Sequence, residues 1–114
     1  MLYRQGDLLF RRLKRKPWDA GKLKKGKIIL EGEATGHAHK LDDDGDAELY
    51  DWLEVRSFSD IGPRRIKSNR CHLRIVSRSK IVHDEHAPVE LDPGWYEIVR
   101  QREFDGKDIR VVTD

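Results

Sequence analysis

Four of the five histidines lie in two tight groups, and imidazoles gathered in this way can bind a metal ion or transfer protons. His37 and His39 form the first group, with the small residues Gly36 and Ala38 beside them. In an extended strand these two rings project to one face, about 7 Å apart along the chain, so that both can reach one ion or one phosphate. The hydroxyl of Thr35 adds a polar contact for such a ligand.

His83 and His86 form the second group, and two acids separate them. A strict strand would place these two rings on opposite faces. Because an apolar run ends at Val82 and Pro88 follows, we expect a bend through which one of the two rings meets the first pair. We therefore predict one catalytic site, made of His37, His39, His83 and His86.

Two kinds of chemistry fit such a site. Three imidazoles with an acid nearby are a known shell for zinc, manganese or iron that leaves a position open for water, and for this role the sequence predicts His37, His39 and His86. Without a metal, one neutral and one protonated imidazole act as general base and general acid on a phosphodiester, since their reference pKa lies near 6.5. RNA is the natural substrate for this chemistry because its 2′-hydroxyl is an internal nucleophile. Of the two chemistries, we favour the metal.

Basic side chains are concentrated in two segments, although the formal net charge is only +2. Residues 11–27 hold nine bases and one acid, residues 64–80 hold seven bases and no acid, and residues 41–54 hold seven acids and no base. A basic face suits a polyanion, which points to nucleic acid as the partner, RNA more than DNA. A solvated surface gives the same pattern. For substrate binding the sequence predicts Thr35, Lys40, Arg100 and Arg102.

Arg100 lies on the same face of a predicted strand as Tyr96 and Ile98. If that face points inward, the guanidinium needs an acid beside it, because a lone buried charge is costly. Asp7 and Glu97 are the two candidates for this acid.

The length of 114 residues suits one domain, residues 1–114. No apolar run is long enough for a membrane span, and the region of Met1 lacks the apolar stretch of a signal peptide, so we expect a cytoplasmic protein. The single Cys71 excludes an internal disulfide and a cysteine-based zinc finger, and it is typical of a small buried residue. His72, beside it, is expected to be a packed or surface histidine outside the site.

Period-two alternation dominates the chain and predicts about eight short strands in a compact antiparallel β-barrel or sandwich. The stretch 17–26 is the place for a loop or for the one short helix that this all-β class allows. Residues 42–46 are typical of a hairpin turn between strands 37–41 and 48–55, and residues 92–94 of a turn between strands 88–91 and 95–104. A second turn at 105–106 leads to a strand at 109–112, and residues 61–63 break the chain.

The three tryptophans are expected to differ in role. Trp52 and Trp95 are typical of core residues in a small domain. Trp18 lies in the basic segment 11–27, where an aromatic ring among cations suits contact with nucleic acid.

Five short motifs are distributed over most of the chain. They are RQGD at 4–7, GEATGHAH at 32–39, EHAP at 85–88, GWY at 94–96 and QREF at 101–104. In these motifs the chain resembles small uncharacterised proteins encoded in bacterial and phage genomes, a likeness that carries no known activity. The pair His37 and His39 also resembles the first histidine pair of a cupin barrel, which is a likeness of architecture.

Taken together, these features predict a histidine-centred hydrolase that cleaves a phosphodiester, RNA in the first place. It acts through a water activated by a divalent metal (zinc, manganese or iron) or through histidine acid–base catalysis. Two alternatives stay open: a non-catalytic nucleic-acid-binding module, and a metal-binding structural or regulatory protein with a cupin-like barrel. Measurements of RNA binding and of metal content distinguish these three functions.

Overall fold

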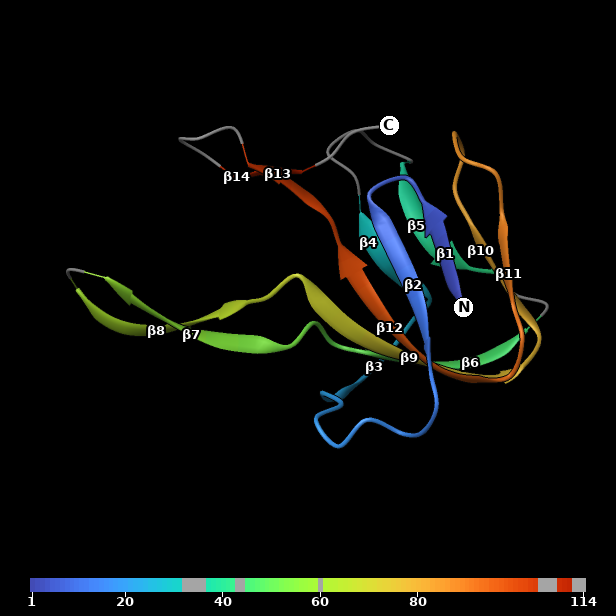
Figure 1. The fold of residues 1–114 in the computed structure, drawn as a ribbon, viewed down its shortest axis with the longest axis horizontal. Coiled ribbons are helices and arrows are strands. Elements are labelled where there is room, and N and C mark those ends of the chain that lie inside the picture. The colour runs from blue at the N-terminus through green and yellow to red at the C-terminus, as the bar shows by residue number, and fades with distance from the viewer. Residues whose placement is uncertain (32–36, 43–44, 60, 105–108, 112–114) are drawn as a thin grey trace.

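The computed structural model describes residues 1–31, 37–42, 45–59, 61–104 and 109–111, and two antiparallel sheets account for most of them (Figure 1). The first sheet has six strands, in the order β1 (Leu2–Gln5), β2 (Leu8–Leu13), β12 (Gly94–Arg100), β9 (Arg70–Ser77), β6 (Asp46–Tyr50) and β3 (Leu23–Lys24). The second has four, in the order β11 (Val89–Leu91), β10 (Ser79–Val82), β5 (Ala38–Leu41) and β4 (Ile28–Glu31). Two separate strand pairs are β7 (Glu54–Ser59) with β8 (Gly62–Lys67), and β13 (Arg102–Phe104) with β14 (Ile109–Val111).

The predicted antiparallel all-β class is confirmed. Every strand pair is antiparallel, and the described residues contain no helix. The two main sheets share no hydrogen-bonded strand pair in the described part of the chain, so the arrangement is a sandwich and not a closed barrel. Nor does that part include a helix with the length and apolar character of a membrane span.

One apolar core lies between the two sheets, because alternate side chains of both point toward it. In β12, Tyr96 and Ile98 are fully buried there, while the neighbouring Trp95 lies on the outer face of the sheet. Cys71 is part of the same core, as predicted, and burial raises the pKa of its thiol to about 12. The core residues of the first sheet are Leu8, Phe10, Leu49, Cys71, Leu73, Ile75, Tyr96 and Ile98, and those of the second are Ile29, Leu41, Ile81 and Leu91.

The two predicted hairpins around residues 42–46 and 92–94 are wrong in their pairing. Strand β5 pairs with β4 and β10, whereas β6 pairs with β3 and β9. Likewise, β11 pairs with β10, whereas β12 pairs with β2 and β9. Both turns therefore lead from one sheet of the sandwich to the other, and residues 43–44 of the first turn and the predicted turn at 105–106 lie outside the described residues.

The predicted strand 48–55 is interrupted at residues 51–53. Strand β6 ends at Tyr50, and the Trp52 ring turns toward the core, where its indole N–H donates to the carbonyl of Ile29 at 3.2 Å. Trp52 thus packs against the core as expected, and the strand that follows, β7, belongs to a different part of the molecule.

Strands β7 and β8 form a two-stranded arm that projects from the sandwich (Figure 1). We call residues 54–67 the arm. The predicted chain break at 61–63 lies at its tip, so the sequence missed both of its strands. At the base of the arm the Ser68 N–H donates to the Leu53 carbonyl at 2.6 Å, and the Leu53 N–H donates to the Arg70 carbonyl at 2.8 Å.

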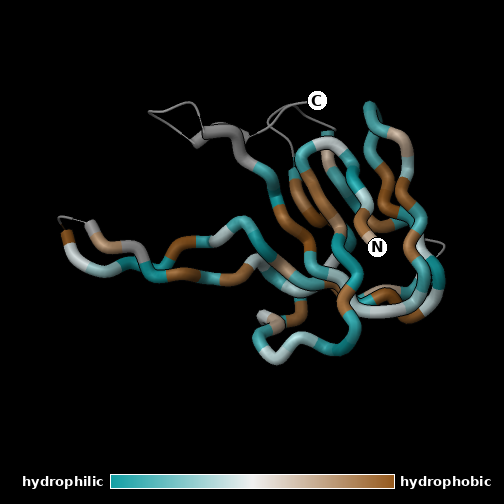
Figure 2. Tube along the Cα trace, in the orientation of Figure 1, coloured by the Kyte–Doolittle hydropathy of each residue, from teal (hydrophilic) through white to brown (hydrophobic). Residues whose placement is uncertain are grey.

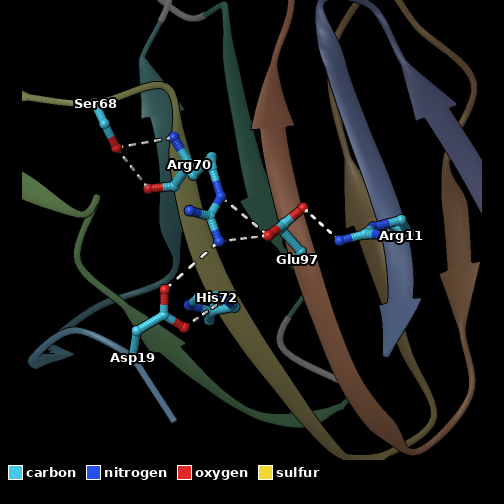
Figure 3. A network of polar contacts seen from close by, with 6 residues as sticks. All are labelled: Arg11, Asp19, Ser68, Arg70, His72 and Glu97. Carbon is cyan, nitrogen blue, oxygen red and sulfur yellow. Dashed lines mark hydrogen bonds and ion pairs between the residues drawn. The ribbon is translucent and has the colours of Figure 1, made fainter. Parts of the chain in front are cut away.

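The outer face of the first sheet carries a network of charged side chains centred on Glu97 (Figure 3). The buried Glu97 carboxylate accepts hydrogen bonds from Arg11 at 3.0 Å and from Arg70 at 2.7 Å. Burial alone raises the pKa of Glu97, but the hydrogen bonds and charge of Arg70 and then those of Arg11 outweigh it, and the net shift is downward. Arg70 also lies 3.6 Å from Asp19, which attaches the loop between β2 and β3 to the sheet.

Substitution of Glu97 by Gln tests this network. Without the carboxylate, the cations of Arg70 and Arg11 lose their common counterion, so we expect the free energy of unfolding to fall by about 2 kcal/mol in chemical denaturation. Glu48→Gln is the matched control, because Glu48 binds Arg74 at the exposed surface of the same sheet at 2.8 Å. It should cost at most about 0.5 kcal/mol, and equal losses in the two variants would contradict a special role for Glu97.

Candidate metal and catalytic site

All four clustered histidines meet at one end of the sandwich. The His83 ring is central: its centroid lies 4.5 Å from that of His39, 4.6 Å from that of His86 and 6.2 Å from that of His37. The rings of His39 and His86 are parallel within 8°, with centroids 6.2 Å apart. We call these four residues the histidine cluster. The sequence predicted that either His83 or His86 would meet the pair His37 and His39. In the structure both rings lie beside His39.

The chain reaches this arrangement by the bend that the sequence predicted. Strand β10 ends at Val82, and residues 84–86 form a bend before β11 begins at Val89. Because β10 is the neighbour of β5 in the sheet, the bend carries His83 and His86 toward the start of β5. His39 lies within β5 with its side chain on the buried face, and His37 immediately precedes that strand.

Gln5 determines which ring nitrogen of the buried His39 carries the proton. The Gln5 amide nitrogen donates to two backbone carbonyls, those of Ile81 at 2.8 Å and Ala87 at 3.0 Å, so its oxygen must face the other way. That oxygen lies 2.9 Å from His39 Nδ1. An amide oxygen only accepts hydrogen bonds, hence Nδ1 carries the proton and Nε2 of a neutral ring presents a lone pair.

That lone pair faces a carboxylate. His39 Nε2 lies 3.2 Å from Asp7 Oδ1, and the other oxygen of Asp7 accepts a hydrogen bond from Arg100 Nε at 3.2 Å. Burial, followed by the charge of His83, lowers the pKa of His39 to about 4, although Asp7 acts in the opposite direction. The ring is therefore neutral at pH 7, and two electron-pair donors face each other at a distance that a shared cation would satisfy.

The open side of the cluster is lined by two acids from the bend. His37 Nδ1 lies 3.0 Å from Glu85 Oε1 and 3.3 Å from Asp84 Oδ2, and Asp84 Oδ1 lies 3.3 Å from His83 Nδ1. His83 Nδ1 also accepts a hydrogen bond from the Glu85 N–H at 3.0 Å. Among the described residues, His37, His83 and Asp84 are a group whose potential ligand atoms all lie within 4.8 Å of one another.

Burial divides the cluster into a closed and an open side. The side chains of His39 and His83 are only 5% and 7% exposed, whereas those of His37, Asp84 and Glu85 are between 31% and 55% exposed. A ligand would enter past His37 and the two acids and meet His83 next.

Gly6 leaves the space that His86 fills. It is the first residue of the two-residue turn between β1 and β2, and its φ of +58° is a conformation that glycine adopts without strain. A Cβ atom at this position would lie 2.7 Å from His86 Nε2 and 3.3 Å from His39 Cε1. Both the conformation and the space therefore require glycine here.

Comparison with known proteins gives one finding. A family model described as a domain of unknown function, DUF8820, matches residues 4–101. The chain belongs to this family. No curated protein and no solved structure matches it. The resemblance to an uncharacterised family is thus confirmed, and its bacterial and phage origin stays a prediction.

The remaining predicted site residues of this DUF8820 chain fall into two groups. Arg100 lies at the edge of the cluster, where it binds Asp7 and not Glu97. Lys40 is exposed and alternates with His39 along β5, so its side chain lies on the opposite face of the strand. Thr35 lies outside the described residues, as does the side chain of Arg102 in β13. Substrate binding by these four residues stays a prediction.

The metal-ligand set predicted from the sequence also stays a prediction, but the described geometry favours a different trio in this DUF8820 chain. The sequence pointed to His37, His39 and His86, whereas the short distances join His37 to His83 and Asp84. The role of Gln5 was missed. Its position in RQGD, next to a turn glycine, is the signal that could have indicated a buried polar residue.

The other histidine and the other tryptophans lie away from the cluster. His72 is buried in the first sheet, where burial lowers its pKa, and its Nε2 lies 3.9 Å from Asp19. Trp95 was expected in the core but lies half-buried on the outer face, with its ring 5.5 Å from that of Tyr50. Trp18 is 95% exposed, so it is available for the contact that the sequence predicted.

We expect the His39 ring of the metal-free protein to remain neutral, with its proton on Nδ1, well below pH 6.5. The folded pKa of about 4 lies below the unfolded value of 6.5, so the unfolded state binds more protons between these values. This group therefore removes stability as the pH falls from 6.5 toward 4. Ring ¹⁵N chemical shifts measured in EDTA report both the tautomer and the titration. In urea the same ring should titrate near 6.5, and a folded ring that titrates there or protonates first at Nε2 would refute the assignment.

Substitution of Gly6 by Ala should displace His86 and destabilise the chain by about 1 to 2 kcal/mol, the cost of a left-handed conformation at a residue with a Cβ. Gly26→Ala is the matched control, because Gly26 also has a positive φ, +91°, but open space where the Cβ would lie. Thermal unfolding should show a loss in both variants, and histidine NMR resonances should shift only in Gly6→Ala. Unchanged resonances in Gly6→Ala would mean that His86 does not depend on this space.

Proposed function

We propose that this chain is a metal-dependent hydrolase that cleaves a phosphodiester, RNA in the first place, and that the histidine cluster is its centre. The observation that carries the proposal is the opposition of electron-pair donors: the Nε2 lone pair of neutral His39 faces Asp7, and Nδ1 of His83, which accepts the Glu85 N–H, lies 3.3 Å from Asp84. Such groups repel one another unless a proton or a cation lies between them.

A divalent transition metal fits the ligands that are present. Imidazole nitrogens with a carboxylate oxygen suit zinc, manganese and iron, and an open position for water is typical of catalytic sites of this kind. The hydrogen bond from His39 Nδ1 to Gln5 is the support that ligating histidines usually have at their second nitrogen. The trio His37, His83 and Asp84 is the best candidate for the ion because it combines short distances with access from solvent.

The acids favour a metal over acid–base catalysis alone. Asp84 and Glu85 line the open side of the cluster, and their negative charge repels the phosphate that acid–base catalysis requires there. A divalent cation held by the cluster would offset that repulsion. The two acids therefore favour metal-dependent hydrolysis over histidine acid–base catalysis without a metal.

The proposed reaction is hydrolysis. A divalent ion held by His37, His83 and Asp84 would supply a water of lowered pKa, and the oxygen of a water adds to the phosphorus. The bond from phosphorus to the leaving sugar oxygen breaks, and that oxygen takes a proton from a neighbouring imidazolium or from water. His86 is the candidate for this proton transfer, since its ring centroid lies 4.6 Å from that of His83 and it does not belong to the proposed trio.

The exposed cations support a nucleic-acid substrate. In the segment 64–80, Arg70, Arg74, Arg78 and Lys80 all have carboxylate partners. Arg64, Arg65 and Lys67 are exposed and have no acid partner among the described residues. Within this segment the cations available to a polyanion are therefore fewer than the sequence suggested, and those three lie on the arm.

The test begins with metal binding. Protein stripped with EDTA should bind Zn²⁺ or Mn²⁺ in calorimetry, and Asp84→Asn should weaken that binding by about 10- to 100-fold. Glu90→Gln is the matched control, because Glu90 is an exposed acid of the second sheet that pairs with Arg78 away from the cluster. Equal affinity in Asp84→Asn and in the wild-type chain would overturn the assignment of this ligand.

Cleavage of labelled single-stranded RNA then tests catalysis. Turnover should require the metal, cease in EDTA, and fall by about 10²- to 10⁴-fold in His86→Ala with the fold intact by circular dichroism. Cleavage that persists in EDTA would show acid–base catalysis instead. Metal binding without cleavage of RNA or DNA would leave the metal-binding structural or regulatory protein as the function.

A further inference from the structure

The arm has the features of a surface that binds a partner. Figure 1 shows it extending beyond both sheets, and its described side chains are exposed in β7 and, after Gly62, throughout β8. Large apolar side chains are among them, with Phe58 76% and Ile61 79% exposed. Figure 2 shows apolar and polar positions interleaved along the arm. A two-stranded hairpin is only marginally stable in water by itself, so this exposure indicates a binding role.

Charge indicates what kind of partner the arm binds. Arg56 lies directly opposite Arg65 in the β7–β8 ladder, and like charges in that position destabilise a hairpin. On the sandwich, by contrast, Arg11, Arg70, Arg74, Arg78 and Arg100 all bind carboxylates. The described residues include no acid partner for the arginines of the arm. An anionic partner would relieve the repulsion, whereas a second copy of the same arm would add to it.

The register places aromatic and cationic groups on one face. Residues directly opposite each other share a face, and faces alternate along the ladder. The pair Phe58 and Pro63 lies two residues nearer the tip and is therefore on the same face as the pair Arg56 and Arg65. Cations beside an exposed ring are what a single-stranded nucleic acid needs, since phosphates bind the cations while bases stack on the ring.

The base of the arm adjoins the edge of the histidine cluster. The Arg100 N–H donates to the Asn69 carbonyl at 2.8 Å, and Asn69 Nδ2 donates to the Arg100 carbonyl at 3.2 Å. The Arg100 side chain in turn binds Asp7, which faces His39. A single-stranded nucleic acid bound along the arm would thus extend past Arg100 toward the histidine cluster.

We propose that the arm binds single-stranded RNA, with Arg56 and Arg65 on the phosphates and Phe58 stacked on a base. This inference deepens the proposed function, and rests on it for the choice of RNA, since it names the element that holds the substrate. A six-residue strand is about 20 Å long, so the arm can follow several nucleotides.

The test measures binding without turnover. Fluorescence anisotropy of a short labelled single-stranded RNA, in EDTA and over a series of salt concentrations, is compared between the full chain and the double variant Arg56→Gln/Arg65→Gln. The double variant should bind at least about 10-fold more weakly at low salt, and its salt slope should fall by about 1.4, as expected for two lost phosphate contacts. Phe58→Ala should weaken binding by about 5- to 100-fold with little change in slope.

Matched controls separate the arm from charge in general and from catalysis. Arg74→Gln/Arg78→Gln removes the same charge from arginines that already bind carboxylates, so affinity should stay within about twofold. Because the assay in EDTA measures binding without metal or turnover, a failure of the hydrolase proposal would leave its result unchanged, which keeps the two proposals distinct. Wild-type affinity in the arm variants, equal losses in both double variants, or stronger binding of duplex DNA than of single-stranded RNA would each overturn the assignment.

Discussion

The buried amide of Gln5 joins the segments on which the histidine cluster depends. From β1 it donates to the carbonyls of Ile81 in β10 and Ala87 before β11, and its oxygen accepts a hydrogen bond from Nδ1 of His39 in β5. One side chain thereby links the two sheets at this end of the sandwich and fixes which nitrogen of His39 is free. Loss of the amide would remove all three of these hydrogen bonds, each of which contributes about 0.5 to 1.5 kcal/mol to stability.

Local patterns predicted the strands, and non-local pairing limited what the sequence could show of the fold. Alternation in segments such as 37–41 and 88–91 marks a strand with one buried face, whatever its neighbours are. The partner of a strand is not encoded in that way. The acidic turn at 42–46 has the composition of a hairpin, yet it connects β5 to β6 across the sandwich, because both strands bury their apolar faces in the same core.

The histidine cluster was partly accessible from the sequence for the same reason. The spacing of His37 and His39 gives their common face, and the proline after the second group indicates the bend, so both clues are local. Which ring nitrogen faces which acid depends on Gln5 and Asp7, which are more than thirty residues away from His39 in the chain. The arm was missed because the glycine and proline at 62–63 were interpreted as a break, although they lie at the tip of a hairpin.

The arm is structurally separate from the sandwich core because its two ends meet at its base. The hydrogen bond between Ser68 and Leu53 brings the two ends of the arm together, and the sandwich core contains no residue from 54–67. The core therefore places little constraint on the length or composition of this segment. Changes in the length, sequence or charge of the arm should therefore cost the sandwich little in folding free energy.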